Sequence, residues 1–126
     1  MNKQDIIKSL ETRNDRSAWN KGVTTYAIDM VDAIEDESVL GSPQLLKKEL
    51  LNGADDWNQY SYGGCALIYD YDIAEMLCTP SELKRTGGGR LQPNSRETWL
   101  DVQARALFQA CERIKRIVRA QSRKAA

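Results

Sequence analysis

The sequence contains no histidine among its 126 residues. This absence removes histidine zinc ligands, the Ser-His and Cys-His pairs that activate nucleophiles, and the commonest general base. Cysteine is also scarce, because Cys65, Cys78 and Cys111 are odd in number and far apart, without a Cys-x-x-Cys pair. That pattern predicts reduced, mostly buried thiols and no disulfide framework. We therefore expect a protein that is not an enzyme and that uses neither a metal nor another cofactor.

Long apolar runs are missing as well. No stretch approaches the roughly 18 apolar residues of a membrane span, and the first residues show no secretory signal. Hydrophobic residues make up 41% of the chain and charged residues 29%, which is typical of a folded globular protein. We expect a single cytoplasmic domain over residues 1–126 that has no membrane partner.

The net charge of the whole chain is zero, but its two parts carry opposite charges. Residues 1–82 carry 7 Lys and Arg against 15 Asp and Glu, whereas residues 83–126 carry 11 against 3. The difference is −8 for the first part and +8 for the second. An acidic part and a basic part therefore exist, and either can face a charged partner, a second copy or the other part. The oligomeric state stays open.

Apolar residues recur at three- and four-residue steps in two long segments. This periodicity predicts helices from about Ser17 to Asp36 and from about Ser95 to Arg119, with a frayed tail over 120–126. A shorter first helix is indicated by Ile6, Ile7 and Leu10. These helices predict an all-α fold.

Capping signals mark the other expected helices. Ser42-Pro43 and Thr79-Pro80-Ser81-Glu82 each begin a helix, and Asn94 with Glu97 caps the last one. Nothing in the sequence predicts a β-hairpin. The fold class that follows is an all-α, single-domain helical bundle of about five helices with a long C-terminal amphipathic helix.

The basic part of the chain is the first candidate site. Clustered cations neutralise phosphates and give salt-dependent affinity for nucleic acid without sequence preference. The alternative is a solvated helix face whose cations lie favourably near the negative end of the helix dipole. The candidate nucleic-acid-binding residues are Lys84, Arg85, Arg90, Arg96, Arg113, Lys115, Arg116 and Arg119.

Residues 72–85 resemble the helix-turn-helix of bacterial DNA-binding proteins. A helix, a tight turn at Cys78-Thr79 and a short capped helix follow one another, and Ala74 occupies the small-residue position. The resemblance implies that Ser81, Lys84 and Arg85 face DNA. An ordinary α-hairpin within the bundle is the competing interpretation, and Glu82 beside the reading face favours it.

Aromatic residues are concentrated in a glycine-bearing segment between Trp57 and Tyr71, which holds five of the nine in the chain. Trp57, Tyr60 and Tyr62 are candidate protein-binding residues, since rigid aromatic rings form interaction hot spots or platforms for stacked bases. The same rings equally fit a role in sealing one end of the bundle.

A wider resemblance extends over most of the chain. The sequence is similar to a family of small uncharacterised proteins from gut-dwelling Gram-positive bacteria, often found on mobile elements. The resemblance implies an accessory role in DNA handling, gene control or inhibition of host defence. It implies no catalytic residue. The segments that carry it are Leu51-Asn52-Gly53-Ala54-Asp55-Asp56-Trp57, Tyr60-Ser61-Tyr62-Gly63-Gly64-Cys65, Leu77-Cys78-Thr79-Pro80-Ser81-Glu82-Leu83-Lys84 and Arg96-Glu97-Thr98-Trp99-Leu100-Asp101-Val102-Gln103-Ala104-Arg105-Ala106.

The sequence thus supports two functional hypotheses. The first is a non-enzymatic module that binds nucleic acid, or a nucleic-acid-bound complex, through its basic part. The alternative is a protein-binding inhibitor or adaptor, for example an anti-defence factor, that uses the aromatic segment and the acidic side of the second helix.

Overall fold

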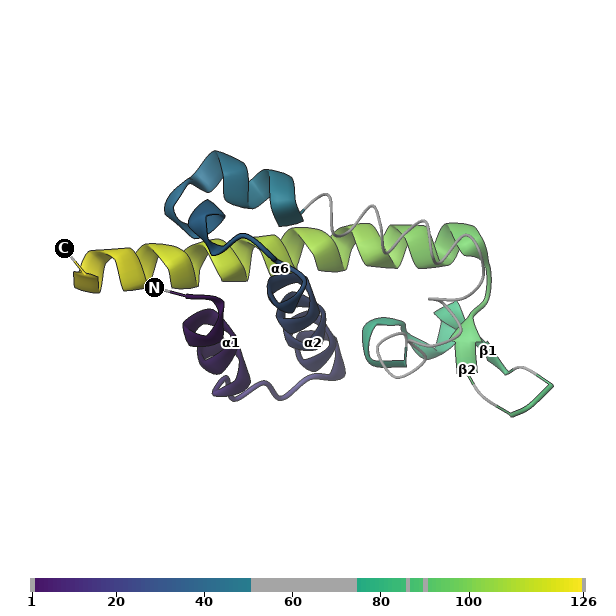
Figure 1. Cartoon of the computed structure of the whole chain (residues 1–126). Coiled ribbons are helices and arrows are strands. Elements are labelled where there is room, and N and C mark those ends of the chain that lie inside the picture. The colour runs from purple at the N-terminus through teal and green to yellow at the C-terminus, as the bar shows by residue number, and fades with distance from the viewer. Residues whose placement is uncertain (1, 51–74, 86, 90, 126) are drawn as a thin grey trace.

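The computed structural model describes residues 2–50, 75–85, 87–89 and 91–125. Three α-helices carry the architecture: α1 (Lys3–Glu11), α2 (Ala18–Asp32) and α6 (Arg96–Ala125). In Figure 1, α6 is a long rod, α1 and α2 pack along one side of it, and residues 43–50 form a helix on the other side. The all-α, single-domain expectation with a long C-terminal helix is confirmed.

Short elements connect these helices. A 3₁₀ helix, η1 (Glu37–Gly41), follows α2, and a second one, η2 (Pro80–Glu82), follows a helical turn over residues 75–77. Strands β1 (Leu83–Arg85) and β2 (Leu91–Pro93) then form an antiparallel hairpin, with Leu83 opposite Pro93. Within the described part of the chain, no helix is long and apolar enough to cross a bilayer.

The core forms where the apolar stripes of the helices meet. Ile6 and Leu10 from α1, Val23 and Val31 from α2, and Ile114 from α6 are all fully enclosed. Among the described residues, the largest fully buried side chain is the indole of Trp99, near the start of α6. Each such side chain contributes about 1.5–3 kcal/mol when it leaves water, so this stripe holds the helices together.

Helix starts in the first half follow the capping rules. Asn2 accepts from the Asp5 amide at 3.0 Å while Asp5 accepts from the Asn2 amide at 3.2 Å, which completes a capping box on α1. Ser17 accepts from the Asn20 amide at 3.1 Å and caps α2. The short first helix expected from Ile6, Ile7 and Leu10 is present as α1, and α2 begins next to the expected Ser17 but ends at Asp32, before the expected Asp36.

The end of α2 is stabilised from outside the helix. The last turn of α2 contains no basic residue, although exposed C-terminal carbonyls favour a cation. The Lys3 ammonium supplies it, donating to the Asp32 carbonyl at 3.0 Å and the Ile34 carbonyl at 2.9 Å. Asp36 in turn accepts from the Ser38 amide and caps η1.

The segment after Cys78 differs from the prediction. Only η2 is helical, and the chain then extends into β1 because Gly87 to Gly89 form a turn that returns it as β2, with Gly89 at φ +82. A positive φ suits glycine, which lacks a Cβ. The prediction of no hairpin was wrong. The helix-turn-helix interpretation also fails, since Lys84 and Arg85 lie on a strand instead of a second helix.

The last helix departs from the prediction at both ends. Ser95, and not Asn94, caps it by accepting from the Thr98 amide at 3.1 Å. Asn94 instead accepts from the Thr98 hydroxyl at 2.7 Å. The helix continues to Ala125, so the tail that was expected to fray from residue 120 is helical.

Gly22 marks a close contact between α2 and the turn over residues 75–77. A Cβ at Gly22 would lie 2.8 Å from Leu77 Cδ2 and 3.0 Å from both Leu77 Cγ and Met76 Cβ. We predict that Gly22→Ala lowers the free energy of unfolding by about 1 kcal/mol. The overlap, which typically costs about 1–3 kcal/mol, outweighs the gain in helix propensity of about 1 kcal/mol.

Urea denaturation measures this change, and Gly41→Ala provides a matched control. No atom lies within 4 Å of a Cβ built at Gly41, so this variant should match the parent or slightly exceed it. A Gly22→Ala protein more stable than the parent would show that the contact is loose.

Candidate nucleic-acid interface

The eight predicted nucleic-acid-binding residues do not form one surface. Lys84 and Arg85 are exposed on β1, where an Arg85 Nη1 donates to the Gly89 carbonyl at 3.0 Å. Arg90 and the side chain of Arg96 lie outside the described residues. The hairpin adjoins the start of α6 (Figure 1). At about 1.5 Å per residue, Arg116 is about 30 Å further along the helix axis.

Arg113 is a correction to the prediction, because it is buried with 8% of its surface exposed. Its guanidinium packs against α2 and donates to the Asn20 carbonyl at 3.1 Å, the Thr24 hydroxyl at 2.9 Å and the Asn20 side chain. Burial lowers the pKa of Arg113, with Arg13 acting in the same direction and Asp15 opposing. Arg113 therefore belongs to the core and is not available to a phosphate.

Asp15 completes the polar network around Arg113. Its carboxylate accepts from Thr24 Oγ1 at 2.6 Å and lies 3.2 Å from an Arg13 nitrogen. Burial raises the pKa of Asp15, but the hydrogen bonds from Thr24 and Arg13 outweigh it and leave the pKa below its ordinary value. The carboxylate is therefore ionised at neutral pH and compensates the charge of Arg113.

Arg116, Arg119 and Arg123 form what we call the basic stripe. Steps of three and four residues place them on one face of α6, and all three are exposed. Among the residues the structure describes, none of the three takes part in an ion pair or a side-chain hydrogen bond. The guanidinium groups of the stripe are therefore available to an external anion.

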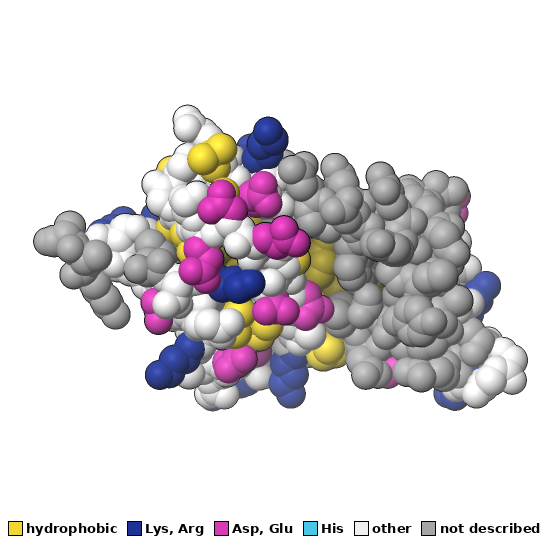
Figure 2. All heavy atoms as spheres, viewed as in Figure 1, with side chains coloured by type: hydrophobic (Ala, Val, Ile, Leu, Met, Phe, Trp, Pro, Cys, Tyr) yellow, Lys and Arg dark blue, Asp and Glu magenta, His cyan; other side chains and the backbone are white. Residues whose placement is uncertain are grey.

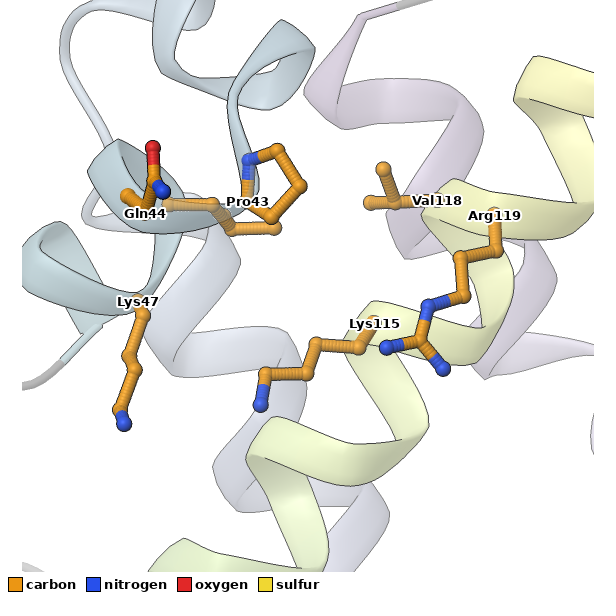
Figure 3. A pocket seen from close by; sticks show the side chains of 7 residues that line it. Pro43, Gln44, Lys47, Lys115, Val118 and Arg119 are labelled. Atoms are coloured by element: carbon orange, nitrogen blue, oxygen red, sulfur yellow. The ribbon is translucent and has the colours of Figure 1, made fainter.

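Lys115 lies at the edge of this face and next to a groove. Its ammonium is 3.6 Å from Glu112, and 28% of its side chain is exposed. The groove separates α6 from the helix over residues 43–50 and has a volume of about 220 Å³. In Figure 3 the side chains of Lys47 and Lys115 extend in the same direction, away from Pro43, and the Arg119 guanidinium lies beside Lys115. We call this space the anion groove because three cations line it. Its lining residues are Pro43, Gln44, Leu46, Lys47, Lys115, Val118 and Arg119.

Sequence reasoning missed the contribution of Lys47. Lys47 and Lys48 are the only cations between Lys21 and Lys84, so the pair lies within the acidic part of the chain. Tertiary packing brings it beside Lys115, and both ammonium groups act on the thiol of Cys111. No local pattern connects residue 47 with residue 115.

The carboxylates collect elsewhere. Figure 2 shows them gathered over α1, α2 and the segment that follows α2. Asp32 at the end of α2, and Glu35, Asp36 and Glu37 in the segment that follows it, are all exposed. The printed ion pairs of the described residues join none of these four to Arg113, Arg116 or Arg119. The acidic and basic parts therefore do not neutralise each other across these groups.

Cys78 is buried and Cys111 is half-buried, and both thiols are free. Burial raises the pKa of the Cys78 thiol to about 11 and also raises the pKa of Cys111, which suppresses the nucleophilic thiolate. The described residues contain no cluster of three or more Cys, Asp or Glu side chains suited to a metal ion. Cys65 lies outside them.

The predicted protein-binding residues Trp57, Tyr60 and Tyr62 lie outside the described residues. A different aromatic surface is present on α6, where 66% of Phe108 is exposed and the Arg105 guanidinium lies 5.8 Å from the Trp19 ring centroid. No sequence pattern predicts this surface, because Phe108 does not belong to the three- and four-residue apolar spacing of α6.

Comparison with protein-family models, curated proteins and solved structures finds no match for this chain. The expected relation to a mobile-element family stays a prediction.

The position of Arg113 yields a stability prediction. Arg113→Gln should lower the free energy of unfolding by about 2–3 kcal/mol, because Asn20, Thr24 and Asp15 lose a buried charged partner. Arg116→Gln removes an equal charge three residues away and should change stability by less than about 0.5 kcal/mol. Urea denaturation of both variants measures the difference, and equal values would place Arg113 outside the core.

Proposed function

We propose that this protein is a non-enzymatic module that binds the phosphate backbone of nucleic acid through the basic stripe of α6, as an accessory or regulatory protein of a mobile element. The observation that carries this proposal is the exposure of Arg116, Arg119 and Arg123 on one helix face without internal carboxylate partners. The mobile-element setting comes from the sequence resemblance alone.

Three physical features favour a polyanion as the partner. Unpaired guanidinium groups donate paired hydrogen bonds to phosphate oxygens. The three arginines follow one another along one helix face, and the phosphate backbone of nucleic acid likewise carries its charges in a row. Glu112 is the last acidic residue of the chain, so no carboxylate of α6 lies beyond it to compete with phosphate. Backbone contacts of this kind confer affinity but no sequence specificity.

Salt dependence tests the proposal directly. The parent protein should bind labelled duplex DNA with an affinity that falls as salt rises between about 50 and 200 mM. The triple variant R116Q/R119Q/R123Q removes three phosphate contacts and should lower the slope of log K against log salt by about 2–3. Fluorescence anisotropy across the salt series measures both slopes.

A matched control removes the same charge elsewhere. Lys8, Arg16 and Lys21 are exposed cations in or beside α1 and α2, and K8Q/R16Q/K21Q should leave the slope almost unchanged. Equal losses in the two triple variants would show that only net charge matters. Absence of binding to duplex and single strand at low salt would remove the function altogether.

The acidic face supports a second candidate function. The exposed carboxylates of Asp32, Glu35, Asp36 and Glu37 form a surface that fits a basic site on another protein, as an inhibitor or adaptor requires. If this function holds, affinity purification should recover a stoichiometric protein partner that D32N/E35Q loses and R116Q/R119Q/R123Q retains. Recovery of nucleic acid alone contradicts it.

A further inference from the structure

The anion groove combines apolar and positively charged residues, and the proposed contacts with backbone phosphates require only the charges. Pro43, Leu46 and Val118 give it an apolar floor, while Lys47, Lys115 and Arg119 bring three positive charges to its rim. None of its lining residues is acidic. A backbone phosphate needs the charges but gains nothing from the apolar floor, so the groove suits a ligand that has both parts.

The charges of the groove come from two elements. Lys47 belongs to the helix over residues 43–50, and Lys115 and Arg119 belong to α6. Within the described part of the chain, Lys47 and Arg119 have no carboxylate partner, and Lys115 has only the 3.6 Å contact with Glu112. Because no lining carboxylate balances these cations, they favour an anion in or beside the groove.

The size of the groove limits the ligand. An apolar cavity of about 150 Å³ accommodates benzene, and drug-sized molecules occupy pockets of about 300–1,000 Å³. The volume of about 220 Å³ between Leu46 and Val118 therefore matches one ring or a short branched chain with an anionic group attached.

We propose that the groove between α6 and residues 43–50 binds a small organic anion with an apolar body, of the size of a monocyclic aromatic carboxylate or phosphate monoester. The apolar body lies on Pro43, Leu46 and Val118. The anionic group accepts hydrogen bonds from Lys47, Lys115 and Arg119. The aliphatic stems of these three side chains extend the apolar surface toward the rim.

An anion bound in the groove also affects the basic stripe, because Arg119 belongs to the stripe and lines the groove. Its guanidinium cannot serve a phosphate of the backbone while it holds the ligand, so the ligand weakens nucleic-acid binding. This consequence rests on the proposed function. The ligand site itself does not, since its occupancy is measured without nucleic acid.

Titration of the methyl-labelled full chain by NMR tests the proposal, with Leu46 and Val118 as reporters. Benzoate should shift both methyl signals saturably, and phenyl phosphate in parallel identifies the preferred anionic group. Acetate lacks the ring and benzylamine carries the opposite charge, so each should bind at least about tenfold more weakly than benzoate if charge and apolar contact both contribute.

Variants locate the charges that matter. K47Q/R119Q should weaken benzoate binding by about tenfold, because charge-assisted hydrogen bonds are lost. R116Q/R123Q removes equal charge from the neighbouring surface of α6 and should change the affinity by less than about twofold. The proposal is overturned if benzylamine binds as well as benzoate, or if neither benzoate nor phenyl phosphate shifts the methyl signals. It is also overturned if K47Q/R119Q and R116Q/R123Q weaken benzoate binding equally. Methyl shifts that depend on protein concentration alone would assign the groove to a second copy of the chain and overturn it as well.

Discussion

The insertion of Arg113 into α2 sets the rotation of α6, and the rest of the surface depends on it. A guanidinium that donates to Asn20 and Thr24 cannot turn outward without leaving buried acceptors unpaired, which costs several kcal/mol. Residues 116, 119 and 123 lie about 60°, 120° and 80° around the helix from residue 113, and all three are exposed, so they lie beside the face that α2 covers. The apolar stripe of α6, fully buried at Ile114 and continued by the partly buried Ile117 and Val118, supports the same rotation.

The unequal division of charge has different structural uses in the two parts of the chain. Several carboxylates of the acidic part have local partners: Asp5 caps α1, Asp36 caps η1 and Asp15 balances Arg113. In the basic part, Arg113 is buried against α2 and balanced by Asp15. Arg105 bridges Glu82 and Asp101 at the surface, whereas the cations near the C-terminus of α6 satisfy only the helix dipole. Arg116, Arg119 and Arg123 thus leave a surplus of unpaired positive charge near the C-terminal end of α6.

That surplus faces two environments. The basic stripe is open to solvent and suits an extended anion such as a nucleic-acid backbone. The anion groove is partly enclosed, and its apolar floor selects for a compact ligand. Arg119 belongs to both surfaces, so the two proposed ligands are linked through one side chain, which is a simple arrangement for control of one binding event by another.

Local patterns in the sequence determined the elements whose signals are local. Apolar periodicity located α1, α2 and α6, and Ser17 located the start of α2, because a capping side chain acts on an amide only three residues away. The hairpin escaped prediction because Leu83 to Arg85 is too short for periodicity, and its pairing with Leu91 to Pro93 depends on the intervening turn. The N-cap of α6 is Ser95 and not the predicted Asn94 for a similar reason. Both side chains can accept a hydrogen bond from a helix amide, and only the backbone geometry selects between them.

The sequence by itself therefore established an all-α protein with a divided charge and no histidine chemistry. Only the tertiary structure decided which cations are free. Arg113 and Arg116 are the same residue type three positions apart, yet one is enclosed by α2 and the other is exposed. Lys47 joins Lys115 although 67 residues separate them along the chain. Composition records how many charges exist, but burial and long-range contacts set which of them water and ligands reach.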